Sequence, residues 1–127
     1  MKRLRVLMAS AEDLVEPIFR KTIEDGGHHL AILNPRNREM EFIAEAKAGG
    51  YDVVIVTNLG LPLDYSLGFI APLRQACSAK VIVMSGVEDR RKGSPRNSGA
   101  PFYKLPISAK QILDAVEEAA GIREFSR

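Results

Sequence analysis

The chain has 127 residues, a length that suits one domain able to bury about two thirds of the surface of its unfolded chain. Its hydrophobic share of 46%, with 27% charged residues, is ordinary for a globular protein and argues against general disorder. The formal net charge of +2, from 18 basic and 16 acidic residues, is too small to favour nucleic-acid binding.

The single cysteine, Cys77, cannot form an internal disulfide, which favours a reducing compartment. No apolar run approaches the roughly 20 residues that cross a membrane, and none resembles the core of a signal peptide. We therefore expect a cytoplasmic protein without membrane association.

Strands and helices alternate from the start of the chain. An apolar strand is expected at residues 4–9, and the helix after it ends at Gly26. A second strand at 29–33 leads to a helix at 39–48, which ends at Gly49. These segments form the first two strand-helix units.

The central strand is predicted at residues 52–57, where a continuous run of β-branched side chains is typical of a parallel strand covered by helices on both faces. A third helix is expected at 65–76, followed by a fourth strand at 80–85 and a short fifth strand at 100–103. A last helix at 107–120 closes the chain.

Residues 88–98 interrupt the alternation because they include no large apolar side chain. A helix there would have no face to bury against a sheet, so we expect a polar loop in place of the fourth helix. The last helix is expected to be capped by Ser108.

Five strand-helix units indicate a parallel sheet with right-handed crossovers and helices on both faces. The pattern favours the α/β, three-layer, doubly wound fold called flavodoxin-like, with strand order 2-1-3-4-5. We expect one domain over residues 1–122 and a short tail at 123–127.

In such a sheet the functional site forms at the carboxyl ends of the central strands. The central strand is followed by Asn-Leu-Gly-Leu-Pro at 58–62, and the fourth strand reads Val-Ile-Val-Met-Ser-Gly at 81–86. Residues 99–106 read Gly-Ala-Pro-Phe-Tyr-Lys-Leu-Pro. On these motifs the chain resembles the receiver domain of bacterial response regulators over about residues 4–120. The resemblance implies a role in two-component, phosphorelay signal transduction.

A receiver of that family carries an acidic pair after its first strand, which holds a magnesium ion together with a phosphorylatable aspartate. Here the acidic pair falls on Ser10 and Ala11, and the phospho-acceptor falls on Asn58. An amide is a poor nucleophile and brings no charge, so neither acyl-phosphate formation nor hard-cation binding is supported. We expect a pseudo-receiver that is not an enzyme and binds no metal and no cofactor.

Two further positions of the family are altered or retained in part. Ser85 matches the small hydroxyl residue that turns toward the phosphoryl group in active receivers, although a strand-end hydroxyl that bonds a loop amide explains it equally well. The family's lysine directly precedes a proline, whereas Leu105 separates Lys104 from Pro106 in this chain. Either Lys104 reaches the pocket through a one-residue bulge or Leu105 fills that place. We favour the second option, in which Lys104 is a solvated residue of a strand edge.

The degenerate phosphorylation pocket is expected to comprise Ser10, Ala11, Glu12, Asn58, Gly60, Ser85 and Lys104. Two alternatives remain open. Glu12, Asp13 or Asp64 would supply carboxylates for a divalent cation if the match is shifted by one or two residues. The neutral hydrogen-bonding groups at the strand ends would instead suit a polar small molecule.

The expected interaction surface is aromatic and basic. Phe102 or Tyr103 matches the aromatic residue that, in the family, couples phosphorylation to the output surface, although a core or edge position explains both equally well. Four cations that would attract an acidic protein surface or a phosphate group lie within seven residues: Arg90, Arg91, Lys92 and Arg96. A solvated basic loop is the alternative interpretation.

The chain continues only a few residues beyond its last helix, so we expect no effector domain. Output would pass through association with a kinase, another receiver or an effector, or through a homodimer. The adjacent His28 and His29 lack partner ligands for zinc, and we expect them to be edge residues.

Overall fold

The structure of the protein is a computed structural model that describes residues 3–10, 16–35, 38–58, 66–85, 100–104 and 108–122, with the side chains at 58, 66–69 and 85 outside the description. Its strands are β1 (Arg5–Ala9), β2 (His29–Leu33), β3 (Val53–Asn58), β4 (Lys80–Ser85) and β5 (Phe102–Lys104). Its helices are α1 (Glu16–Asp25), α2 (Glu39–Ala48), α3 (Ser66–Ala76) and α4 (Ala109–Ala119).

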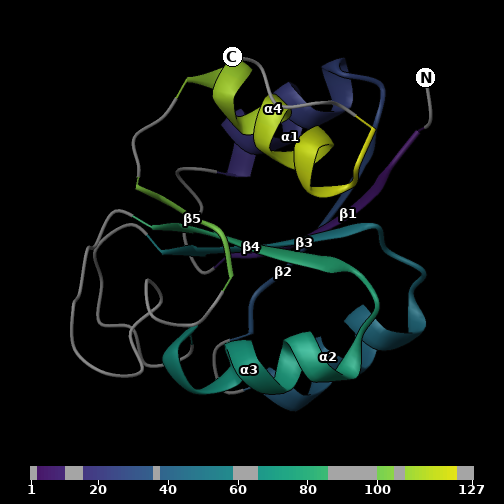
Figure 1. Cartoon of the computed structure of the whole chain (residues 1–127), viewed down its shortest axis with the longest axis vertical. Helices are drawn as coiled ribbons and strands as arrows, with labels where there is room; N and C mark the ends of the chain where they lie inside the picture. Colours follow the sequence, from purple (N-terminus) through teal and green to yellow (C-terminus); the bar gives the residue numbers. More distant parts are fainter. Residues whose placement is uncertain are drawn as a thin grey trace.

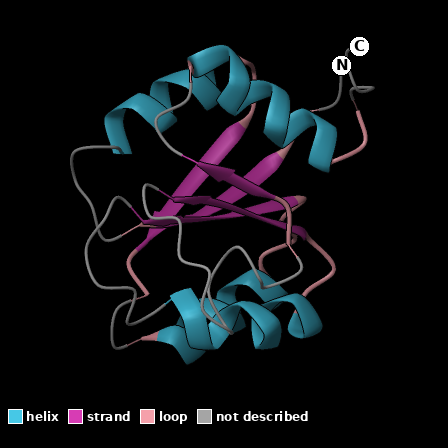
Figure 2. Cartoon of the chain, turned by 60° about the vertical axis from the view of Figure 1, so that its left-hand side comes forward, coloured by secondary structure: helices cyan, strands magenta, loops and turns pink. Residues whose placement is uncertain are grey.

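The strands form one parallel sheet in the order β2-β1-β3-β4-β5. Helices α1 and α4 cover one face, and α2 and α3 cover the other, as the edge-on view of the sheet shows (Figure 1). The three layers are separated clearly when the molecule is turned (Figure 2). The predicted doubly wound fold and its strand order are confirmed.

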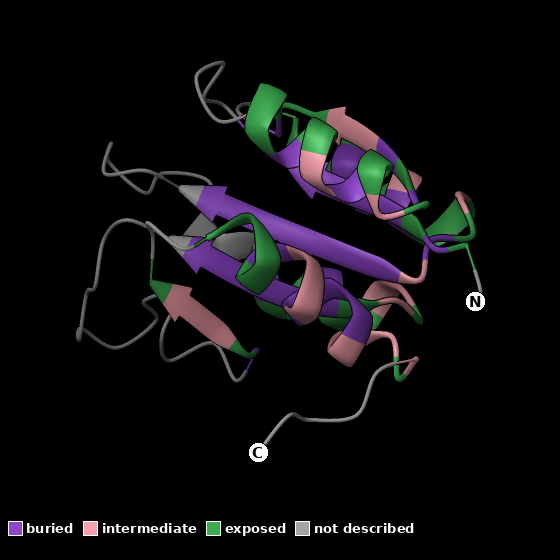
Figure 3. Ribbon diagram, turned by 90° about the horizontal axis from the view of Figure 1, so that it is seen from above, coloured by how far each residue is buried: buried purple, intermediate pink, exposed green. Residues whose placement is uncertain are grey.

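Two cores result, one on each face of the sheet. Val54 and Val56 of β3 pack in the core beneath α2 and α3, whereas Val53 and Ile55 pack in the core beneath α1 and α4. All four side chains are fully buried because successive residues of a strand point to opposite faces. The β-branched run in the sequence reflects this burial on both faces, and the buried strands lie at the centre of the molecule (Figure 3).

The start of the last helix carries a polar signal in the sequence. Helix α4 begins with a capping box, in which the Gln111 amide donates to Ser108 Oγ over 3.1 Å and the Ser108 amide donates to Gln111 Oε1 over 2.8 Å. The predicted cap at Ser108 is confirmed. Strand β2 and helix α2 also cover the predicted residues.

Strand β5 begins two residues later than predicted. The amide of Val83 donates to the Pro101 carbonyl over 2.8 Å, but proline has no N–H with which to extend the ladder backwards. Paired residues therefore start at Phe102.

The predicted polar loop at 88–98 and the tail at 123–127 lie outside the described residues. Within the described ranges no helix is long and apolar enough to cross a membrane.

Candidate functional site

The last residues of three neighbouring strands lie in one row. Asn58 at the end of β3 is in register with Ser85 at the end of β4, and Ser85 is in register with Lys104 at the end of β5. The sequence placed these three positions in one pocket from motifs that lie far apart along the chain. The register of the sheet brings their main chains together at one edge.

Ser10 continues β1 toward the same edge. Its amide donates to the Leu33 carbonyl over 3.0 Å, and the residue is only 1% exposed. Next to it, the buried hydroxyl of Thr57 donates to the Ala9 carbonyl over 2.8 Å, which ties the end of β3 to the end of β1. The Ser10 and Thr57 side chains are neutral and buried, and an ionised carboxylate in the place of Ser10 would need compensating partners.

The short strand β5 presents its residues to both faces of the sheet. Phe102 packs against the core beneath α2 and α3, and Tyr103 packs against the core beneath α1 and α4, each partly buried. Burial raises the pKa of the Tyr103 phenol, and the nearby Glu118 carboxylate raises it further. Lys104 is exposed in a regular strand conformation.

Several predicted site residues lie outside the described part of the chain: Ala11, Glu12, Asp13, Gly60, Asp64, Arg90, Arg91, Lys92, Arg96 and Leu105. The main chains of Asn58 and Ser85 are described, but their side chains are not. Among the residues that the structure does describe, no group of three or more histidine, cysteine, aspartate or glutamate side chains is placed to hold a metal ion.

No protein-family model matches the sequence, and no curated protein matches it. Solved structures do. The receiver domain of the Francisella response regulator 1452 superposes with a TM-score of 0.73 at 18% identity, covering 94% of this chain and 98% of that chain. A CheY-like response-regulator receiver domain protein from Methanospirillum hungatei gives a TM-score of 0.77 at 14% identity, covering 94% of this chain and 95% of that chain. An orphan response regulator of H. pylori gives a TM-score of 0.72 at 19% identity, covering 96% of this chain and 100% of that chain.

The chain has the receiver fold. The fold expected from the resemblance is therefore confirmed over almost the whole chain, and the match spans nearly all of each of these structures as well. In the receiver fold of this chain, the row of strand ends at Asn58, Ser85 and Lys104 occupies the edge where doubly wound sheets form their sites.

One buried polar pair was missed by the sequence interpretation. His28 precedes β2 and is 2% exposed, so the prediction that both histidines are edge residues is wrong for His28, while His29 is exposed. The Leu4 amide donates to His28 Nδ1 over 3.0 Å, and His28 Nε2 lies 2.8 Å from Glu117 Oε2. Because Nδ1 accepts a hydrogen bond, the proton is on Nε2 and is donated to the carboxylate.

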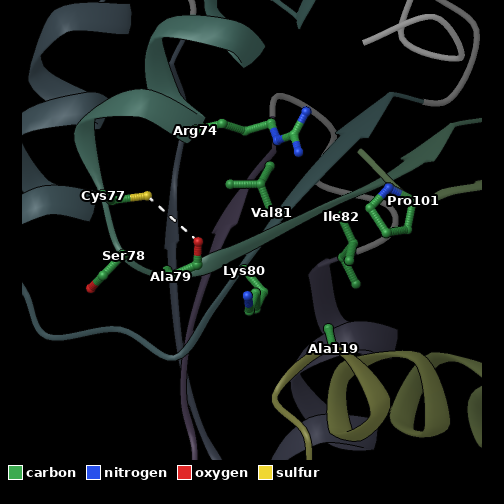
Figure 4. A pocket seen from close by; sticks show the side chains of 9 residues that line it. All are labelled: Arg74, Cys77, Ser78, Ala79, Lys80, Val81, Ile82, Pro101 and Ala119. Atoms are coloured by element: carbon green, nitrogen blue, oxygen red, sulfur yellow. Dashed lines mark hydrogen bonds between the residues drawn. The ribbon is translucent and has the colours of Figure 1, made fainter. Parts of the chain in front are cut away.

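The described pocket of the receiver fold lies away from the row of strand ends. It has a volume of about 290 Å³ and lies where α3 leads into β4. Figure 4 shows the residues that line it: Arg74, Cys77, Ser78, Ala79, Lys80, Val81, Ile82, Pro101 and Ala119. Sequence reasoning did not identify this pocket, because its lining residues come from three separate stretches of the chain, residues 74–82, Pro101 and Ala119.

Proposed function

We propose that the chain is an atypical receiver-like signalling domain, a pseudo-receiver, that acts through phosphorylation-independent protein-protein interaction. The register that aligns Asn58, Ser85 and Lys104 is the observation that carries this proposal. This register supports the assignment of Asn58, an amide, to the position of the family's phospho-acceptor aspartate. The receiver fold supports a role in signal transduction.

The residues at the strand ends favour a pocket whose charge is not changed by phosphorylation or by a bound cation. An amide at position 58 offers no carboxylate to form an acyl phosphate, and the buried Ser10 offers no anionic oxygen to a divalent cation. A kinase would therefore leave the charge of this pocket unchanged. Information would pass by docking to a kinase, another receiver or an effector in the cytoplasm, without enzymatic activity, a cofactor or nucleic acid.

The test is an NMR titration of the full chain with Mg²⁺ and then with beryllofluoride, a phosphoryl mimic. We expect the amide signals of Ser10, Asn58 and Ser85 to stay in place at millimolar concentrations of both. Saturable shifts of these signals in the wild-type chain would overturn the proposal. If Glu12→Gln or Asp13→Asn abolished such shifts, the domain would be a cation-responsive module, the alternative left open by the sequence.

A matched gain-of-function variant shows whether the titration can report binding. Asn58→Asp combined with Ser10→Asp and Ala11→Asp restores three carboxylates on the same backbone, and Asn58→Asp alone restores one without burying new charge beside β1. We expect Mg²⁺-dependent shifts in the triple variant and none in the wild type. Equal responses of the two proteins would contradict the assignment of the pocket.

The first question about the partner is whether the chain associates with a second copy of itself. Sedimentation equilibrium over a hundredfold range of protein concentration separates a homodimer from a monomer. A monomer at all concentrations directs the search to a kinase, a separate receiver or an effector, whereas a dimer makes a second copy the partner.

A further inference from the structure

The outer face of α2 carries an apolar ridge that contacts solvent. Residues four apart lie one above another on a helix, so Met40, Ala44 and Ala48 form one row along α2. Met40 is 77% exposed, the most of any large apolar side chain that the structure describes, and both alanines are exposed. The opposite side of α2 is buried in the core that it shares with α3, in the layer at the bottom of Figure 1. The ridge therefore has no packing partner within the described part of the chain.

Two opposite charges flank this ridge. Glu41 lies on one side of it near the start of α2, and Lys47 lies on the other side near the end. Both side chains are exposed, and neither forms an ion pair with a residue that the structure describes. Each charge suits the helix dipole at its own end, which accounts for their signs in a single copy of the chain. The dipole does not require their spacing from Ala44.

The five residues of this outer face are arranged symmetrically about Ala44. Met40 and Ala48 lie four residues before and after it, and Glu41 and Lys47 lie three residues before and after it. In an antiparallel pair of α2 helices related by a two-fold axis at Ala44, each residue lies level with its counterpart in the second copy. Met40 then packs against Ala48 of the second copy, and Glu41 meets Lys47 of the second copy.

Size and charge both favour this antiparallel pair over a parallel one. A large side chain opposite a small one lets the two surfaces interlock, and the small Ala44 at the axis lets the helices approach to about 8 Å. Opposite charges meet twice, once on each side of the axis. A parallel pair would instead set Met40 on Met40, Glu41 on Glu41 and Lys47 on Lys47.

We propose that the outer face of α2 is the contact surface of an antiparallel homodimer, with a second copy of this chain as its partner. Helix α2 has ten residues and is about 15 Å long, so contact through this helix alone buries less than the about 1,200 Å² of the smallest stable complexes. The dimer is therefore weak and reversible. It forms at high protein concentration, or where another interaction already holds two copies close together.

The inference goes beyond the proposed function because it assigns a surface and an occupant to a part of the molecule that the strand-end chemistry does not use. It concerns α2, so it holds whether or not the strand end at Asn58 binds a cation. Titration with Mg²⁺ and beryllofluoride tests the strand ends, and neither reagent is needed to test the dimer.

The first experiment is disulfide trapping at the two-fold axis. Ala44→Cys in a Cys77→Ser background places a thiol at the axis, where the α-carbons of the two copies come within the about 4.4–6.8 Å that a disulfide spans. We expect this variant to form a covalent dimer in a glutathione redox buffer at least tenfold faster than Ala109→Cys, which exposes a thiol on α4 in the same background. Gel electrophoresis without reductant measures both rates.

The second experiment is a charge swap followed by sedimentation equilibrium. Glu41→Lys and Lys47→Glu each replace the two attractive contacts of the dimer by repulsive ones, so each should raise its dissociation constant about tenfold. The double variant restores opposite charges and should return to within about twofold of the wild type. High salt should bring the single variants close to the wild type, because these charges are exposed. Circular dichroism checks that each variant keeps its helices.

Three results would each overturn the proposal. The first is a wild-type chain that stays monomeric at millimolar concentration, which would leave the outer face of α2 to a different partner. The second is equal trapping of the two cysteine variants, which would indicate random collision. The third is a folded double variant that associates no better than the single variants, which would mean that Glu41 and Lys47 serve only the helix ends.

Discussion

At the scale of single residues, the buried pair of His28 and Glu117 is the main contact that sequence reasoning did not find. The imidazole accepts from the Leu4 amide and donates to the carboxylate, so it links the start of β1 to the end of α4. Nothing in a lone His-His dipeptide and a glutamate 89 residues away indicates that contact. Only the packing of α4 beside α1 brings the two side chains together.

This pair gives a prediction with a control in the adjacent residue. His28→Ala removes the acceptor of the Leu4 amide and the donor to a buried carboxylate, so we expect the free energy of unfolding to fall by about 3–5 kcal/mol. His29→Ala, at an exposed position, should change it by less than about 0.5 kcal/mol. Urea denaturation of the two variants and the wild type is the measurement. Similar costs for both would mean that the buried pair does not stabilise the fold.

The site residues show how far the sequence alone could reach. The strand-end positions Asn58, Ser85 and Lys104 were predicted from motifs, and the register of the sheet aligns their main chains. The burial of Ser10 could not be predicted, because it depends on the Leu33 carbonyl and on the neighbouring end of β3.

At the scale of elements, the bounds of β2, α2 and β4 were predicted to the residue, and those of α4 to within two residues. Gly49 follows α2 and Ser108 caps α4, so a local signal marks these two helix ends. The start of β5 was placed too early because the sequence gives no register, and Pro101 ends the ladder only by its position opposite β4.

The cap of α4 gives a second prediction. Ser108→Ala removes the side-chain acceptor of the Gln111 amide and should lower the free energy of unfolding by about 1 kcal/mol. Ser108→Asp keeps an acceptor at the same place and should retain most of the stability. Thermal or urea unfolding distinguishes them, and equal losses in the two variants would contradict a capping role.

The turn after α2 gives a third prediction. Gly49 has an ordinary φ of −82°, but a methyl group there would overlap the Tyr51 ring and lie 2.9 Å from the Glu45 carbonyl oxygen. Gly49→Ala should therefore cost about 1–3 kcal/mol of unfolding free energy through overpacking.

A double-mutant cycle identifies the cause of that cost. If the Tyr51 ring is the obstacle, Gly49→Ala should cost markedly less in a Tyr51→Ala background, with a coupling of about 1 kcal/mol or more. An unchanged cost in both backgrounds would place the strain elsewhere in the turn.

At the scale of the whole molecule, stability should depend on pH in the alkaline range. Burial raises the pKa of the Tyr51 phenol above its usual 10.0, and the hydrogen bond and charge of Glu45 raise it further, against a smaller opposing effect of Arg5. The folded state thus favours the neutral phenol more than the unfolded state does. That contribution is complete below about pH 10 and is lost as the pH rises through the pKa of the folded state.

The measurement compares wild type and Tyr51→Phe by urea unfolding between pH 8 and pH 11. At pH 8 the variant should be less stable by about 1 kcal/mol, because it lacks the hydrogen bond of 2.7 Å from the phenol to Glu45 Oε2. Above pH 10 the difference should shrink. A difference that stays constant across the range would show that Tyr51 does not titrate with folding.

The fold as a whole was the most predictable level. Alternating apolar strands and amphipathic helices leave few arrangements once crossovers are right-handed, and the strand order followed from that restriction. The pocket where α3 leads into β4 was not predictable, because the residues that line it come from separate stretches of the chain.

The length of β4 separates the two ends of the sheet. Ser85 ends the strand at the row of strand ends, and Lys80 begins it beside the pocket where α3 leads into β4, about 17 Å away at 3.3 Å per residue. A small molecule bound at the row of strand ends would therefore make no direct contact with that pocket.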